Sequence, residues 1–164
     1  PCYWTYFDTG YKYSQYDPKR EWNHAISIMG GSTYLIDNPN ITSVWGDAIN
    51  IDRNSQNITI NNLKANCVGR SIVSNTGSTN TTINGGEAYG AFYWTFNIEP
   101  FGDRVVRNYK VNNFKVGFSR GQVIFSDGPD FNCQVYDVDF TNLTYTTAYQ
   151  EKAINSCVVS QIAY

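Results

Sequence analysis

The chain has 164 residues, with 12 basic and 14 acidic side chains, a formal net charge of −2 and a pI near 5.3. This length is sufficient for one domain with a hydrophobic core, and in the absence of a clustered basic stripe we expect no nucleic-acid partner. No run approaches about 18 consecutive apolar residues, and no basic segment followed by an apolar one opens the chain. We therefore expect no membrane span, and no signal peptide is visible.

Residues 1–22 differ from the rest of the chain because they are rich in tyrosine and tryptophan and carry no repeated pattern. We expect them to form an aromatic N-terminal loop segment or part of an earlier coil. Residues 23–164 carry the repeats described next. A solenoid normally has polar end caps, and neither end of this sequence resembles one, so we expect a fragment of a longer chain.

Two short strand-like runs recur about every 23 residues from residue 23 onward. The first run occupies residues 25–28, 48–51, 71–74 and 95–98, at offsets of 23, 23 and 24 residues. The second run occupies residues 34–37, 59–62, 82–85 and 110–113. Polar turns separate the runs, which is typical of a chain that coils into a solenoid and buries the inward residues of each coil against the next.

The repeat predicts an all-β parallel β-helix with about 23–30 residues per coil. The predicted coils span residues 23–45, 46–69, 70–93, 94–120 and about 121–152, and a sixth begins at residue 153. A β-sandwich is the alternative, but it predicts Asn-Gly hairpin turns between consecutive strands, and that signal occurs only at Asn84-Gly85. The loops lengthen toward the C-terminus, and variable loops are where a solenoid carries its binding surface.

Asparagines recur at one place in the repeat and are expected to hydrogen-bond to one another from coil to coil. They are Asn61, Asn62, Asn84, Asn112 and Asn113. Four Asn-x-Thr triplets also occur, and they begin at Asn40, Asn57, Asn80 and Asn142. Three of the four share a position in the repeat, so turn chemistry explains them at least as well as N-glycosylation does.

The cysteines give no sign of a metal site. Cys2, Cys67, Cys133 and Cys157 form no Cys-x-x-Cys pair and have no metal-like spacing with the only histidine, His24. The chain is neither short nor dense in cysteine, so free thiols are favoured over a disulfide framework. We expect no metal and no cofactor.

Stacked coils bring equivalent residues together in columns. If Ile26, Ile49, Ile72 and Phe96 point inward, the residues two positions later, Ile28, Ile51, Ser74 and Ile98, do so as well. The next column then faces outward and reads Met29, Asp52, Asn75 and Glu99.

Two carboxylates in this outward column are candidates for catalysis. With coils about 4.8 Å apart, the backbones of Asp52 and Glu99 would lie about 9.6 Å apart, a separation that suits an inverting glycosidase. Glu99 would act as the acid and Asp52 as the base, with Asn75 between them contacting substrate. Glu99 follows Ile98 and precedes Pro100, and an apolar setting can raise a carboxyl pKa. The alternative is that both are ordinary solvated acids.

A second column, at the entrance of the first strand, is chemically mixed and reads His24, Asp47, Arg70 and Trp94. Trp94 and the neighbouring Tyr93 offer flat faces to sugar rings, and Arg70 could bind the carboxylate of an acidic sugar. Asp47 is the second choice for the base, and His24 is a possible substrate contact. The alternative is an Asp47–Arg70 ion pair with His24 as a bystander.

Three motifs lie in these coils: WGDAINI at residues 45–51, NITINN at residues 57–62 and FNIEP at residues 96–100. They resemble the right-handed parallel β-helix of the pectate-lyase-like superfamily and, more narrowly, the tailspike depolymerases of bacteriophages. In that family such motifs carry an acid, an arginine and a glutamate, which here match Asp47, Arg70 and Glu99. The resemblance implies a homotrimeric spike on the virion tail, assembled with other phage tail proteins, that binds and usually cleaves bacterial surface polysaccharide.

The sequence also departs from that superfamily. It lacks the acid pair and Arg-x-Lys cluster of polygalacturonase-like enzymes, and it lacks the calcium-site acids and Arg-x-Pro-x-x-Arg signature of pectate lyases. These absences argue against pectin as the substrate and leave hydrolase and lyase chemistry both open. Two other functions also stay open: a tail fibre or adhesin that binds glycan without cleaving it, and a structural solenoid segment that spaces other domains.

Overall fold

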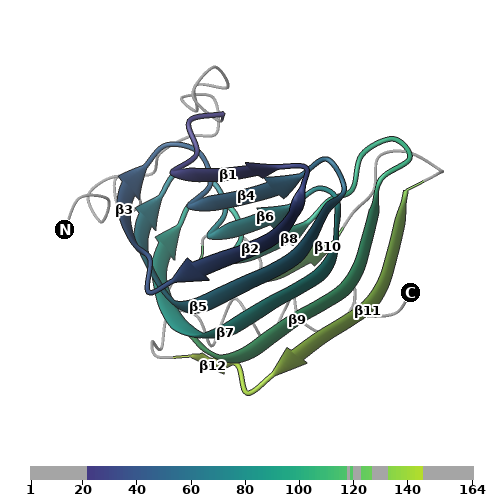
Figure 1. Cartoon of the computed structure of the whole chain (residues 1–164). Helices are drawn as coiled ribbons and strands as arrows, with labels where there is room; N and C mark the ends of the chain where they lie inside the picture. The colour runs from purple at the N-terminus through teal and green to yellow at the C-terminus, as the bar shows by residue number, and fades with distance from the viewer. Residues whose placement is uncertain (1–21, 118, 120–122, 127–132, 146–164) are drawn as a thin grey trace.

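The computed structural model describes residues 22–117, 119, 123–126 and 133–145. These residues form twelve strands and no helix, and every strand pairing is parallel. The chain coils through about four turns of a β-solenoid (Figure 1). The prediction of a parallel β-helix is therefore confirmed, and the β-sandwich alternative is excluded because consecutive strands do not pair as antiparallel hairpins.

Each coil contributes one short strand to the first of two sheets, here called the short-strand sheet. Its members, in spatial order, are β1 (Ile26–Met29), β4 (Ile49–Asp52), β6 (Val73–Asn75), β8 (Phe96–Ile98) and β10 (Ile124–Ser126). Both faces of the central strands are buried: Ile49, Val73 and Phe96 are fully buried, and so are the intervening Ser74 and Asn97.

The remainder of each coil forms the long-strand sheet, which curves around the other side of the solenoid (Figure 1). Its members are β2 (Ser32–Asp37), β5 (Ser55–Val68), β7 (Ser78–Ala91), β9 (Val105–Val116) and β11 (Gln134–Thr141). Two further strands extend it, β3 (Asn40–Val44) beside β5 and β12 (Thr144–Tyr145) beside β9.

The long strands bend because a residue in the left-handed backbone region occurs at every fifth position. In β5 these residues are Asn57, Asn62 and Cys67, with φ of 52°, 53° and 55°. Each one shifts the in–out alternation by one residue, so the side chains of β5 that join the hydrophobic core are 58 and 60, then 63 and 65, then 68. The equivalent residues in β7 are Asn80, Gly85 and Gly90. Asparagine and glycine predominate because they adopt this conformation at the lowest steric cost.

Exposed asparagine ladders connect the coils along these bends. Asn84 Nδ2 donates to Asn61 Oδ1 over 3.2 Å, and Asn112 Nδ2 donates to Asn84 Oδ1 over 3.1 Å. A second ladder runs from Asn108 to Asn80 and on to Asn57, with both bonds at 2.9 Å. The predicted stacking of asparagines is thus confirmed, and three of the four Asn-x-Thr triplets begin at left-handed residues, namely Asn57, Asn80 and Asn142.

The core lies between the two sheets and is filled by columns of aliphatic side chains. Ile60, Ile83 and Val111 lie in register on β5, β7 and β9, and none has exposed surface. Aromatic rings fill the space toward the C-terminal coils, where the rings of Phe96 and Phe114 meet edge to face with centroids 5.1 Å apart. The stack therefore supplies the buried apolar surface that no single coil could provide.

The predicted register is wrong by one residue in the third coil. Val73, and not Ile72, pairs with Ile49, and Asn75, and not Ser74, lies in line with Ile51. The physical reason is one extra residue in the turn after β4, where Arg53 and Asn54 both have φ of 56°. The second run of the repeat is also displaced by one residue in the first coil, where Leu35, and not Tyr34, pairs with Thr59.

Two cysteines fall within the described residues. Cys133 is free, as predicted, but Cys67 is disulfide-bonded, so the prediction of free thiols is wrong for Cys67. Cys2, Cys157, the aromatic segment up to residue 21 and the predicted sixth coil lie outside the described residues.

Candidate functional site

The end of the short-strand sheet carries a partly exposed column that we call the carboxylate edge, made of Met29, Asp52, Thr76 and Glu99. Met29 pairs with Asp52, and the backbone hydrogen bonds of Thr76 to Ile51 and of Glu99 to Asn75 continue the column. Asp52 and Glu99 therefore lie two coils apart on one edge, as predicted. The residue between them is Thr76, and not the predicted Asn75.

Asn75 itself is fully buried and contacts its own coil. Its Nδ2 donates to Ser78 Oγ over 2.7 Å, and its Oδ1 accepts from the Gly77 amide over 3.2 Å. The predicted substrate-binding role for Asn75 does not fit this position, because the side chain has no exposed surface with which to contact a ligand.

Each carboxylate of the edge is held by a neighbouring donor. Asn97 Nδ2 donates to Glu99 Oε2 over 3.1 Å, which fixes the direction of that partly exposed carboxylate. Asp52 accepts from the Arg53 amide over 2.6 Å and forms an ion pair with the guanidinium of Arg104. Both members of the pair are mostly buried, with side chains 13% and 30% exposed.

Arg104 is a residue that sequence reasoning missed, because it comes from the loop after β8, fifty-two positions from Asp52. It reaches Asp52 across Gly77 of the intervening coil. A Cβ at Gly77 would lie 3.1 Å from both Cβ and Cδ of Arg104, so a larger residue would push the arginine aside. Asp52 is in register with Thr76, so Arg104 does not belong to its column, and the repeat carries no signal for this contact.

The entrance column forms a buried ionic corner around Asp47. This aspartate has no exposed surface, and its Oδ1 accepts from the Ser71 amide over 2.9 Å. Its Oδ2 lies 3.2 Å from His24 Nδ1 and 3.5 Å from Arg70 Nη1. His24 Nδ1 also accepts from the Asp47 amide over 3.0 Å.

The predicted Asp47–Arg70 ion pair is therefore present, but neither of its residues lies on an open surface. Ser71, and not Arg70, occupies the column position above Asp47, because of the extra residue in the preceding turn. The side chains of His24 and Arg70 are only 5% and 16% exposed. The corner is therefore a buried network that joins coils one, two and three.

Two aromatic side chains lie beside this corner and keep part of their surface exposed. The rings of Tyr93 and Trp94 stack with centroids 5.1 Å apart and an interplanar angle of 25°. Phe92, which is buried, meets Tyr93 edge to face. Of the predicted sugar-binding residues, Tyr93 and Trp94 are thus the two that present flat faces at the surface.

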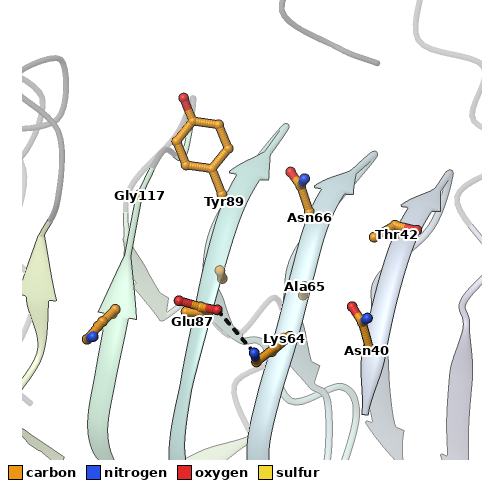
Figure 2. Close-up of a pocket in the computed structure, with 10 residues that line it drawn as sticks. Asn40, Thr42, Lys64, Ala65, Asn66, Glu87, Tyr89 and Gly117 are labelled. Carbon is orange, nitrogen blue, oxygen red and sulfur yellow. Dashed lines mark ion pairs between the residues drawn. The ribbon is translucent and has the colours of Figure 1, made fainter. Parts of the chain in front are cut away.

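A third feature lies on the outward face of the long-strand sheet, and sequence reasoning missed it. It is a groove of about 320 Å³ that crosses β3, β5, β7 and β9, and we call it the sheet groove (Figure 2). Its lining residues are Asn40, Thr42, Lys64, Ala65, Asn66, Glu87, Ala88, Tyr89, Lys115 and Gly117.

The sheet groove is built from two parallel rows of side chains. One row reads Asn40, Lys64, Glu87 and Lys115, in register across the four strands. The second row lies two residues further along each strand and contains Thr42, Asn66 and Tyr89 (Figure 2). Partial burial raises the pKa of Tyr89 above its ordinary value, which lies well above neutral pH already, so its hydroxyl can donate a hydrogen bond.

Comparison with known proteins does not assign this chain to a family. No family model, no curated protein and no solved structure matches the sequence or the fold. The structure itself shows the architecture, which is a parallel β-solenoid of about four turns. Among the residues described, no helix is long and apolar enough to cross a membrane, and no group of three or more metal-binding side chains comes together.

Proposed function

We propose that this chain is a segment of a bacteriophage tail spike that binds bacterial surface polysaccharide and cleaves it at the carboxylate edge. The proposal rests on one observation: Asp52 and Glu99 lie on the same edge of a parallel solenoid, two coils apart. Two carboxyl groups so separated leave room for a water molecule beside a sugar, as inverting glycosidases require. The motifs that resemble tailspike depolymerases support the same assignment.

In this proposal Glu99 protonates the leaving oxygen and Asp52 activates the water. Asn97 directs the Glu99 carboxyl, and Arg104 fixes the Asp52 carboxylate. Asp47, although it belongs to the resembling motif, has no exposed surface, so we assign it to the buried corner.

The location and assembly belong to the same proposal. A spike of this kind acts outside the host cell, on the virion tail, as a homotrimer attached to other tail proteins. These features rest on the resemblance, and a measurement of native mass by light scattering tests the trimer directly.

A purely adhesive spike is the second candidate, and one observation favours it. Arg104 already forms an ion pair with Asp52, so the Asp52 carboxylate is less able to accept a proton from water than an unpaired carboxylate would be. An adhesin would bind polysaccharide with the same fold and release no product.

The test is Glu99→Gln, assayed for new reducing ends or unsaturated sugars on a panel of purified capsular and lipopolysaccharide glycans. We expect Glu99→Gln to lower cleavage by about a hundredfold or more, with binding and thermal stability retained, because the amide cannot donate a proton to the leaving oxygen. Asp103→Asn, a matched change at an exposed acid in the same loop, should leave cleavage unchanged. Parental cleavage by Glu99→Gln rules out this acid, and binding without any product by the parent protein supports the adhesin.

A further inference from the structure

In the charged row of the sheet groove, Lys115 has no ion pair within the described part of the chain, whereas Lys64 has one. Lys64 Nζ lies 3.6 Å from Glu87 Oε1, and both side chains are about 60% exposed, at 62% and 58%. An exposed pair of this kind contributes little to stability and can rearrange when a ligand binds. Lys115 lies on the other side of Glu87 in register, and it supplies the second positive charge of the row.

The second row of the groove carries an aromatic ring that is positioned by a glycine. A Cβ at Gly117 would lie 2.0 Å from Cδ2 of Tyr89, so the ring occupies space that any other residue would fill. Lys115 lies two residues before Gly117 on the same outward face of the chain, next to Glu87 of β7. The groove thus combines a flat ring, a cation and the amide groups of Asn40 and Asn66 on neighbouring strands.

The chemistry of the groove favours a sugar chain over a peptide. Where they line the groove, β5, β7 and β9 already pair with neighbours on both sides, and among the described strands only β3, which pairs with β5 alone, has an edge to which a peptide could add. Away from that edge the groove offers only side chains, and they are amides, a hydroxyl, charges and one ring. This set matches a ligand with many hydroxyl groups, flat apolar faces and negative charges.

We propose that the sheet groove binds an acidic polysaccharide, with Lys115 contacting its carboxylates and the Tyr89 ring packing on a sugar face. This site lies on the long-strand sheet and is separate from the carboxylate edge, so it does not require that the protein cleave glycan. The two lysines outnumber the single glutamate, which selects for an anionic chain over a neutral one.

The test measures binding of the whole chain by affinity electrophoresis in gels that contain alginate, with dextran as the neutral glycan and poly-L-glutamate as the acidic peptide. We expect retardation by alginate alone, weaker at high salt. Lys115→Ala should weaken the alginate affinity by about tenfold, because a charge-assisted contact is lost. Tyr89→Ala should weaken it by about fivefold, and Gly117→Ala should act in the same direction because it displaces the ring without removing it.

Two further variants distinguish binding at the sheet groove from nonspecific attraction to charges elsewhere on the protein. Lys110→Ala removes an exposed lysine from the same strand outside the groove and should leave the affinity unchanged, whereas Glu87→Gln should strengthen binding. Equal losses for Lys110→Ala and Lys115→Ala, equal retardation by dextran, or equal retardation by poly-L-glutamate each overturn the proposal. Because Lys115 and Tyr89 both keep exposed surface, circular dichroism should show an unchanged fold for their variants.

Discussion

Two adjacent asparagines should respond in opposite ways to the same pair of substitutions. Asn62 has φ of 53°, whereas Asn61 is not among the left-handed residues. Both are on the surface of β5, and both belong to ladders: Asn62 Nδ2 donates to Asn38 Oδ1 over 3.0 Å, and Asn61 Nδ2 donates to Asp37 Oδ1 over 3.3 Å. Gly85 occupies the column of Asn62 on the next coil, so glycine is already accepted there.

The magnitudes follow from backbone geometry. Loss of an exposed ladder bond should lower the free energy of unfolding by about 0.5–1 kcal/mol per bond, and Asn62 makes one such bond whereas Asn61 makes two, one to Asp37 and one from Asn84. Alanine at residue 62 adds about 1–2 kcal/mol for the left-handed conformation, so Asn62→Ala should cost about 2 kcal/mol and Asn62→Gly about 1 kcal/mol. At residue 61 the order reverses, because glycine in an ordinary strand costs about 0.5–1 kcal/mol more than alanine.

Thermal unfolding followed by circular dichroism gives the comparison. A change of about 1 kcal/mol shifts Tm by about 2–4 °C for a chain of this size, so Asn62→Ala should melt about 4–8 °C below the parent protein and below Asn62→Gly. Asn61→Gly should in turn melt below Asn61→Ala. If glycine is the worse substitution at both residues, the bend is not made by a left-handed residue and the argument fails.

Other predictions concern buried polar groups. The hydroxyl of Tyr109 is fully buried and has no hydrogen-bonding partner in the described structure, so Tyr109→Phe should raise the free energy of unfolding by about 1 kcal/mol in urea titration; a loss of similar size would reveal a partner. Burial raises the pKa of Tyr109 far above its ordinary value, so the folded state keeps the proton where the unfolded chain loses it. Stability from this group is complete below about pH 10 and declines above it, so Tyr109→Phe should lose less stability at alkaline pH than the parent protein, while the smaller contribution of Tyr89 remains. Asp47→Ala breaks the buried corner and should cost about 3 kcal/mol or more, whereas exposed Asp139→Ala should cost little; equal effects would show that the corner is not a stabilising network.

The sequence alone was sufficient to establish the solenoid, because each coil repeats the same local pattern. Columns such as Ile60, Ile83 and Val111 keep a fixed place in the repeat, and the asparagines that follow them mark where the chain bends. The same columns placed Asp52 and Glu99 on one edge, since that inference needed only the number of coils between them.

Only the tertiary structure decided the register of the strands and which side chains contact the candidate site residues. A single extra residue in the turn at Arg53 and Asn54 leaves the hydrophobic pattern almost unchanged, yet it moves Asn75 from the surface to the core. The ion pair of Asp52 with Arg104 depends on a side chain that crosses a whole coil, and no local pattern encodes it. The sheet groove likewise exists only where strands from four coils lie side by side, because adjacency across a sheet is set by stacking and not by neighbouring residues in the chain.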